Sequence, residues 1–397
     1  MRRILVSFFA LAILAAGCGD EDPAPAAQIS ASDDGTTDLE PASDPTTTLP
    51  AVVEIPTTFT TTLAPAPTTT AEELAEVGPY PVGITTRTLE SGELVEIWYP
   101  AGDDATGLTD AYTVRDFTPT IMRDLVPEEI NDRLEIAAGR DATTATDGPF
   151  PLVMFSHGST SFRLQSSRLA HHLASWGMVV SSTDHPSRAL INMLASPEDA
   201  RSSVDNVFAM RALVLADETF GPIIDESRVG MSGHSAGGGT TLAVASAGDI
   251  AGYVSYASGA FSDEPLPDVP SLFMAGEIDT IVEPGRTADA FSAAPAPSWY
   301  LEFADSGHLA FSDLCAVGDG DATLIDLADA AGLSDFLNDG IRRLGTDGCE
   351  DPNRPVKEVW PGIHQATTGF FRFVFGTDES PVGLDESVTT NVTIQSK

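Results

Sequence analysis

The stretch SRVGMSGHSAGGGTTLAV contains a serine placed where it could act as a nucleophile. Ser235 has Gly233 two residues before it and Gly237 two residues after it, between an apolar run and a helix-forming run. Glycines at these positions permit a sharp turn from strand to helix, which lifts the hydroxyl above the sheet edge beside a helix N-terminus. The pattern therefore predicts a catalytic serine rather than an ordinary surface turn.

A serine hydroxyl is a weak nucleophile, so it needs a base and a carboxylate that orients the base. In a strand–turn–helix architecture of this kind, the order along the chain is serine, acid, histidine. Asp279 directly follows the apolar stretch LFMAGEI, and His308 lies in the loop after SWYLEF. We predict Ser235 as the nucleophile, Asp279 as the orienting acid and His308 as the general base.

Other acids and histidines fit these roles less well. Two acids lie in a Pro-rich loop before the strand, one lies two residues before the predicted acid, and one has the context of a turn. In that order they are Asp263, Asp268, Glu277 and Asp305. His364 is interpreted as a residue at the start of a helix. Three histidines precede the nucleophile, which is the wrong order for the base: His171, His172 and His185.

Acyl transfer also needs hydrogen-bond donors for an oxyanion that develops in the transition state. The backbone N–H of Ala236, directly after the nucleophile, is the first predicted donor. The second is expected from the loop FSHGST, where Gly158 permits a close approach and the N–H of Ser159 can face the oxyanion. His157 and His234 flank these elements, and we expect them to support the loops through hydrogen bonds.

Short apolar runs alternate with helical patterns along the chain, which predicts an α/β fold with a mostly parallel central sheet and helices on both faces. The domain is expected to span residues 79–376, followed by a C-terminal tail at 377–397. Two stretches interrupt the alternation, at about 102–148 and 316–350. Both have apolar residues at helical spacing and are predicted to be helical insertions, the second close to His308.

The motifs FSHGST, GHSAGGGT, GEIDTIV and SGHLAFSD, in this order, resemble the α/β-hydrolase fold. They are most similar to its platelet-activating factor acetylhydrolase-like branch, which borders on dienelactone hydrolases and bacterial polyester hydrolases (cutinases). The opening GPYPVGITTRTLESGELVEIWYP also resembles this branch. The resemblance spans roughly residues 78–376, matches poorly in the insertions, and implies ester hydrolysis through an acyl-serine intermediate without a metal or organic cofactor. Cutinases have an aromatic residue where this chain has Ser159, which argues against a polymer substrate.

The N-terminal residues carry targeting signals. Residues 1–17 read as a secretory signal peptide, because Arg2 and Arg3 precede the apolar run ILVSFFALAILAAG. LAAGC resembles a bacterial lipobox, in which Cys18 would be diacylated, although Ala15 stands where leucine is commoner. Residues 18–78 are rich in Thr, Pro, Ala and acidic residues, and are predicted to form a disordered tether. We expect an extracytoplasmic, membrane-anchored lipoprotein, with ordinary secretion as the alternative.

The formal net charge of −39 argues against nucleic acid as a partner, since its phosphates are bound through Lys and Arg. Cys315 and Cys349 remain once Cys18 is lipidated, and an oxidising compartment favours a disulfide between them, with two unrelated buried thiols as the alternative. The cysteine and histidine spacings match no metal site, and no obligate protein partner is implied.

Together these features predict a serine carboxylic ester hydrolase of the short-acyl esterase or lipase type, acting on a small-molecule or lipid ester. One alternative is an amide, thioester or polyester hydrolase with the same triad, since one triad serves all of these bonds. A more distant alternative is a non-catalytic surface-binding lipoprotein. Acyl and alcohol specificity depends on pocket walls, and the sequence does not define them.

Overall fold

The computed structural model describes residues 69–397, apart from several short segments. The segments outside the description are 118–122, 124–125, 127, 129–130, 132, 189–201, 261–264, 317–322, 331–333, 335–337 and 389–390. The predicted signal peptide, the predicted lipidation site Cys18 and most of the predicted tether also lie outside the described residues.

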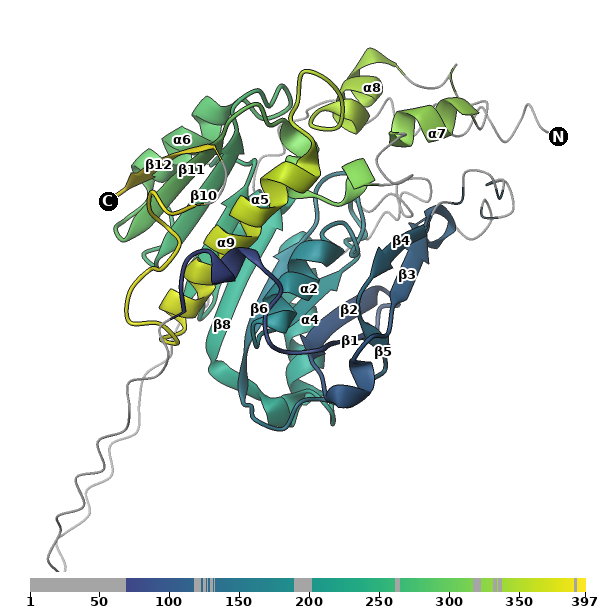
Figure 1. Ribbon diagram of the computed structural model, residues 1–397, viewed down its shortest axis with the longest axis vertical. Helices are drawn as coiled ribbons and strands as arrows, with labels where there is room; N and C mark the ends of the chain where they lie inside the picture. Colours follow the sequence, from purple (N-terminus) through teal and green to yellow (C-terminus); the bar gives the residue numbers. More distant parts are fainter. Residues whose placement is uncertain are drawn as a thin grey trace, which may run out of the picture. The chain divides into compact units, whose positions relative to one another are not determined.

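The described chain is built around a ten-stranded sheet (Figure 1). Its strands are β1 (Val82–Thr88), β2 (Leu94–Pro100), β5 (Gly139–Arg140), β6 (Phe150–Ser156), β7 (Val179–Thr183), β8 (Ile224–His234), β9 (Gly252–Tyr256), β10 (Ser271–Gly276), β11 (Ser298–Phe303) and β12 (Val392–Ser396). Their spatial order is β12-β11-β10-β9-β8-β6-β7-β2-β1-β5. The six strands from β11 to β7 are parallel, whereas β12, β2 and β1 join through antiparallel pairs. The mostly parallel sheet predicted from the sequence is thus confirmed.

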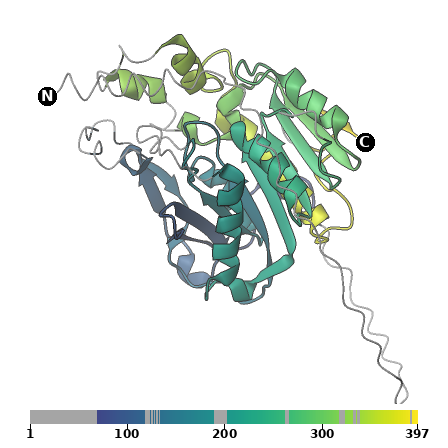
Figure 2. The same cartoon turned by 180° about the vertical axis from the view of Figure 1, so that it is seen from behind.

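Helices cover both faces of this sheet, as Figures 1 and 2 show from opposite sides. The helices over the sheet are α2 (Ser167–Ser175), α4 (Ser203–Ala216), α5 (Ala236–Ala247), α6 (Pro284–Ala293) and α9 (Val356–Val374), whereas α7 (Leu324–Ala330) and α8 (Asp339–Thr346) belong to the second insertion. One core lies under α2 and α9, and the other lies under α4, α5 and α6. The central strands are buried on both faces, which explains why β6 reads as an unbroken apolar run.

The first insertion differs from the prediction. Its described residues form a two-stranded sheet from β3 (Asp110–Thr113) and β4 (Arg133–Ile136), together with β5 and short 3-10 turns. Leu134 and Ile136 are buried while Arg133 and Glu135 are exposed, so the apolar period here is two. The prediction of a helical insertion at 102–148 was therefore wrong in the described residues. The second insertion contains α7 and α8, as predicted.

The compact unit extends beyond the predicted limits of 79–376. At its beginning, Leu74 in the turn η1 (Glu73–Ala75) is fully buried and packs against α9. At its end, Leu384 and Val388 join the core, and β12 pairs with β11. The last ten residues of the predicted tether and the predicted C-terminal tail are therefore part of the fold, because they supply apolar side chains and an edge strand.

Candidate active site

Ser235 lies on a strained turn between β8 and α5. Its backbone has φ 57° and ψ −123°, a conformation that side-chain-bearing residues rarely adopt and that costs on the order of 1–3 kcal/mol. The Ser235 N–H donates to the carbonyl of Tyr256 at the end of β9, over 2.9 Å. The serine therefore occupies the sheet's carboxyl edge at the N-terminus of α5.

The two glycines of the turn allow backbones to touch. A Cβ at Gly233 would lie 2.3 Å from the carbonyl oxygen of Gly237, and a Cβ at Gly237 would lie 2.0 Å from that of Ser156. Backbone atoms cannot move aside as a flexible side chain can, so both positions require glycine. This is the steric role that the sequence predicts for them.

Asp279 and His308 are joined by a buried hydrogen bond. His308 Nδ1–H donates to Asp279 Oδ2 over 2.8 Å, and the two side chains are 1% and 0% exposed. The other carboxylate oxygen accepts the N–H groups of Ile281 and Val282, each over 2.8 Å. His308 Nε2 is buried and has no hydrogen-bond partner among the described residues. The imidazole is thus fixed in one tautomer, with its Nε2 lone pair available to accept a proton.

Strained backbone gathers around this edge of the sheet. Five described residues other than glycine have positive φ, and four of them border the predicted site. They are Thr160 in the FSHGST loop, Ser235, Ala257 after β9, and Asp305 before His308. Strain of this kind persists where the surrounding structure enforces it, and it concentrates at functional sites.

A chain of hydrogen bonds connects the candidate oxyanion loop to the candidate base. Gly158 N–H donates to Gln165 Oε1 over 2.7 Å, and Gln165 Nε2 donates to His234 Nδ1 over 2.7 Å. His234 Nε2 then donates to the carbonyl of His308 over 3.0 Å. Because the N–H groups of Gly158 and Thr160 already donate to Gln165 and Arg188, the Ser159 N–H stays the candidate oxyanion donor of this loop.

His157 supports the same loop from behind. Its Nδ1 donates to the carbonyl of Gly158 over 2.8 Å, and its Nε2 accepts the backbone N–H of His185 over 3.0 Å. Burial lowers the pKa of His157 to about 3 and holds the pKa of His234 well below its ordinary value, so both rings are neutral at pH 7. They therefore act as neutral hydrogen-bonding supports, as their positions in the sequence suggest.

Arg188 links the two segments that carry the candidate oxyanion donors. Its guanidinium donates to the carbonyl of Ala236 over 3.0 Å and to Ser156 Oγ over 2.6 Å. Its own carbonyl accepts the N–H of Thr160 over 2.9 Å. Burial lowers the pKa of Arg188 to about 9, so the side chain remains a cation at neutral pH. The sequence analysis did not identify this residue.

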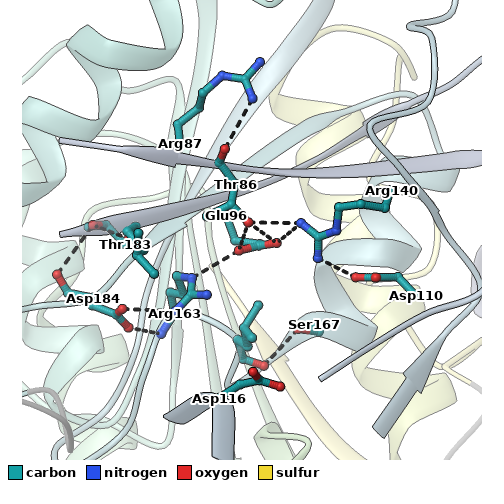
Figure 3. Close-up of polar contacts among 12 residues, drawn as sticks. Thr86, Arg87, Glu96, Asp110, Asp116, Arg140, Arg163, Ser167, Thr183 and Asp184 are labelled. Atoms are coloured by element: carbon teal, nitrogen blue, oxygen red, sulfur yellow. Dashed lines mark hydrogen bonds and ion pairs between the residues drawn. The ribbon is translucent and has the colours of Figure 1, made fainter. Parts of the chain in front are cut away.

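The segment after the candidate oxyanion loop is anchored by an ion network around the buried carboxylate of Glu96 (Figure 3). Arg163 pairs with Glu96 on β2 and with Asp184 after β7, each over 3.1 Å. Arg140 on β5 binds the other oxygen of Glu96 over 2.7 Å and also pairs with Asp110 on β3. Removing one partner of such a network leaves a buried charge uncompensated. The network therefore ties the first insertion to the segment that follows the loop.

The rival acids and histidines have structural roles or lie outside the description. Glu277 accepts the N–H of Asp305, which forms the expected turn before His308. Asp268 is exposed, and Asp263 lies outside the described residues. His364 lies in the middle of α9, which corrects its assignment to the start of a helix. Burial and neighbouring positive charge keep its pKa well below the ordinary value.

Two further observations bear on possible ligands. No group of three or more metal-binding side chains occurs in the part of the chain that the structure describes. A cavity of about 380 Å³ is lined by Ala260, Arg286, Asp289 and Ala290, and none of the predicted catalytic residues lines it. This cavity therefore does not define where an acyl group would bind.

No helix among the described residues is both long and apolar enough to cross a membrane.

Comparisons with known proteins bear on the first part of the domain and on the fold. Residues 78–220 match the model of the family "Platelet-activating factor acetylhydrolase, isoform II", a segment that includes the FSHGST loop and ends before Ser235. No curated protein matches the chain. Among solved structures, a ferulic acid esterase from Streptomyces cinnamoneus matches with a TM-score of 0.57 and 18% identity, over 80% of this chain and 96% of that chain. This likeness establishes the fold.

Proposed function

We propose that this chain, a platelet-activating factor acetylhydrolase-like member of the α/β-hydrolase superfamily, is a serine-type carboxylic ester hydrolase. The observation that carries the proposal is the state of His308. Its Nδ1 is bound to Asp279, and its buried Nε2 has no partner among the described residues. A histidine held this way serves as a general base for a nearby hydroxyl, and Ser235 stands on the strained turn beside His234, whose ring lies 4.7 Å from that of His308.

The reaction proceeds in two steps. His308 Nε2 takes the proton of Ser235 as its Oγ attacks the ester carbonyl, and the backbone N–H groups of Ser159 and Ala236 stabilise the oxyanion. The alcohol leaves with that proton, so an acyl-serine remains. Water then gives a proton to His308 as it attacks the acyl carbonyl. His308 passes that proton to Ser235 Oγ as the acyl–oxygen bond breaks, so the carboxylic acid leaves and the serine hydroxyl is restored. Asp279 stabilises the imidazolium in both steps.

The first test is Ser235→Ala, assayed with p-nitrophenyl esters from acetate to palmitate and with methyl ferulate. We expect kcat to fall by a factor on the order of 10⁶, to the uncatalysed background, with an unchanged thermal unfolding temperature. Ser396→Ala on the exposed end of β12 is the matched control and should keep wild-type activity. Ester turnover that survives in Ser235→Ala would contradict the assignment of the nucleophile.

The test also separates the alternatives. Turnover that peaks at short acyl chains supports a short-acyl esterase. If no ester is hydrolysed but a fluorophosphonate labels Ser235, the serine is activated and acts on amide or thioester bonds. If neither occurs, the chain is a binding lipoprotein with a hydrolase fold.

The proposal includes an extracytoplasmic location, supported by the signal-peptide pattern and the lipobox-like LAAGC. A diacylated Cys18 supplies the two chains that stable anchoring requires. In cells fed an alkyne-tagged palmitate, the wild-type chain should be labelled and Cys18→Ser should not. Label that persists in Cys18→Ser would rule out this anchor.

A further inference from the structure

One carboxylate bridges the loop of the candidate acid and the loop of the candidate base. Asp347 Oδ1 accepts the backbone N–H of His308 over 2.6 Å. Its Oδ2 accepts the backbone N–H of Thr280 over 3.0 Å and also the Thr280 hydroxyl. The main-chain carbonyl of Asp347 accepts the N–H of Leu309 over 2.8 Å. A single residue therefore holds the position after Asp279 and the two positions at His308 and Leu309.

The base loop is seated closely against this carboxylate. A Cβ at Gly307 would lie 2.3 Å from Asp347 Oδ1 and 2.6 Å from Asn353 Oδ1. Behind the same loop, a Cβ at Gly276 would lie 2.3 Å from the carbonyl oxygen of Ser306. Asp347 is itself buried. The loop is thus confined between β10 and the second insertion, so its position depends on that insertion.

A disulfide fixes the insertion near the base. Asp347 directly follows α8, and Cys349, two residues later, is bonded to Cys315. Cys315 lies on the other side of the insertion, with its Sγ 3.9 Å from the carbonyl of Leu309. The cross-link joins two residues that are 34 apart in sequence and limits how far Asp347 can move from the His308 loop.

We infer that Asp347 is a positioning residue for the Asp279–His308 pair, and that the Cys315–Cys349 disulfide keeps it in place. The inference rests on the proposed function. Asp347 contacts main-chain groups of both loops, so it sets where the imidazole is held and leaves substrate contacts untouched. A misplacement of about 1 Å at a reacting group costs about 10²-fold in rate. The loss should appear in kcat, with KM little changed.

The experiment compares Asp347→Ala and Asp347→Asn with wild type in the mature full-length chain. We measure kcat and KM for p-nitrophenyl acetate, and amide hydrogen exchange in peptides covering residues 280–282 and 306–310. Asp347→Ala should lower kcat by about 10²-fold and should speed exchange in both peptides by about tenfold. For Asp347→Asn, both kcat and the exchange rates should lie between those of wild type and Asp347→Ala. The amide oxygen can accept from one loop, but the NH₂ group cannot accept from the other.

Asp329→Asn is the matched control. Asp329 lies on α7 of the same insertion, where its half-buried carboxylate pairs with Arg342 over 2.9 Å, and no hydrogen bond or ion pair links it to either loop in the described part of the chain. It should keep wild-type kcat and wild-type exchange. Opening the disulfide, by Cys315→Ser with Cys349→Ser or by reducing the folded wild-type protein, should give a loss between wild type and Asp347→Ala. The reduced protein supplies the result if the double variant does not fold.

Wild-type kcat in Asp347→Ala, or unchanged exchange in both peptides, would overturn the inference. An equal rise in KM would also overturn it, since it would place Asp347 in substrate binding. If the wild-type chain hydrolyses no ester, the proposed function fails, but the exchange measurement still decides. Faster exchange in Asp347→Ala would then still support the inference that Asp347 positions the Asp279–His308 pair, whatever reaction the pair serves. Unchanged exchange would reject that inference.

Discussion

Ser235 and the Asp279–His308 pair reach the same sheet edge by different routes. Ser235 stands between β8 and α5, which are adjacent in sequence, and two glycines within two residues of it allow the turn. Asp279 and His308 are 29 residues apart, and Asp347, 39 residues after His308, holds both loops. Ser235 is therefore positioned by local sequence, whereas the Asp279–His308 pair is held by contacts with a distant insertion. Substitutions at the turn should therefore impair folding, whereas substitutions in the Asp279–His308 pair should mainly lower kcat.

The largest effect is expected at the turn. Gly237→Ala places a Cβ 2.0 Å from the carbonyl oxygen of Ser156 and 2.8 Å from that of His157, both main-chain atoms. We expect the variant to lose cooperative thermal unfolding and to be recovered mainly as aggregate. Gly285→Ala, also in the first turn of a helix, meets nothing within 4 Å and should unfold like wild type. A well-folded Gly237→Ala would show that the turn can relax.

Asp279→Asn tests the acid–base pair without removing side-chain volume. The amide cannot hold the imidazole in the same tautomer or stabilise the imidazolium, so kcat should fall by a factor on the order of 10⁴. The thermal unfolding temperature should change far less than in Gly237→Ala. A loss of folding as severe as that of the glycine variant would remove the contrast between the two regions.

Gln165→Leu tests the connection between the regions. It leaves the Gly158 N–H and His234 Nδ1 without their partner, and an unpaired buried polar group costs about 1–3 kcal/mol. We expect a free energy of unfolding lower by about this amount and a clear decrease in kcat. The same replacement at the exposed Gln395 on β12 is the control. If Gln165→Leu and the control had the same free energy of unfolding in urea, the hydrogen bonds of Gln165 would not contribute to stability.

The smallest effect is expected at His172, which belongs neither to the turn of Ser235 nor to the Asp279–His308 pair. His172 donates from Nε2 to the carbonyl of Leu74, and burial lowers its pKa to about 4. The unfolded state therefore binds more protons than the folded state between pH 6.5 and 4, so stability decreases as the pH falls through this window. His172→Gln keeps a donor and should reduce that slope by up to about 1.4 kcal/mol per pH unit. Its kcat at pH 7 should be unchanged; an unaltered slope in urea unfolding at each pH would argue against the role of His172.

The sequence predicted what local patterns encode. The order of strands and helices, the turn around Ser235 and the candidates Asp279 and His308 all come from runs of fewer than about a dozen residues. The 2.8 Å contact between Asp279 and His308 agrees with that expectation, and their catalytic roles remain proposals. Apolar runs suffice here because a parallel sheet brings the carboxyl ends of its strands to one edge.

The features that the sequence did not predict involve contacts between residues distant in sequence, or segments whose apolar spacing fits both a helix and a strand. Gln165 lies two residues before α2, and nothing near it in sequence indicates that it binds Gly158 and His234. Nothing in the sequence around Asp347 distinguishes it from the other acidic residues of the chain, because its contacts with Thr280 and His308 form only in the folded insertion. In the first insertion, the predicted helical spacing was wrong at Leu134 and Ile136, which lie two apart on the buried side of a strand. Only tertiary packing resolves such cases.

The two ends of the sheet protect their main-chain groups differently. β5 is only two residues long, so that edge offers little for another chain to pair with. At the other end β12 runs antiparallel along β11, and the N–H and C=O of Lys397 both bond to Ser298. A chain truncated before Val392 would leave β11 as a long open edge, able to recruit a strand from a second molecule. Sedimentation should show such a truncated chain associating with itself, so purification tags belong at the other end of the domain.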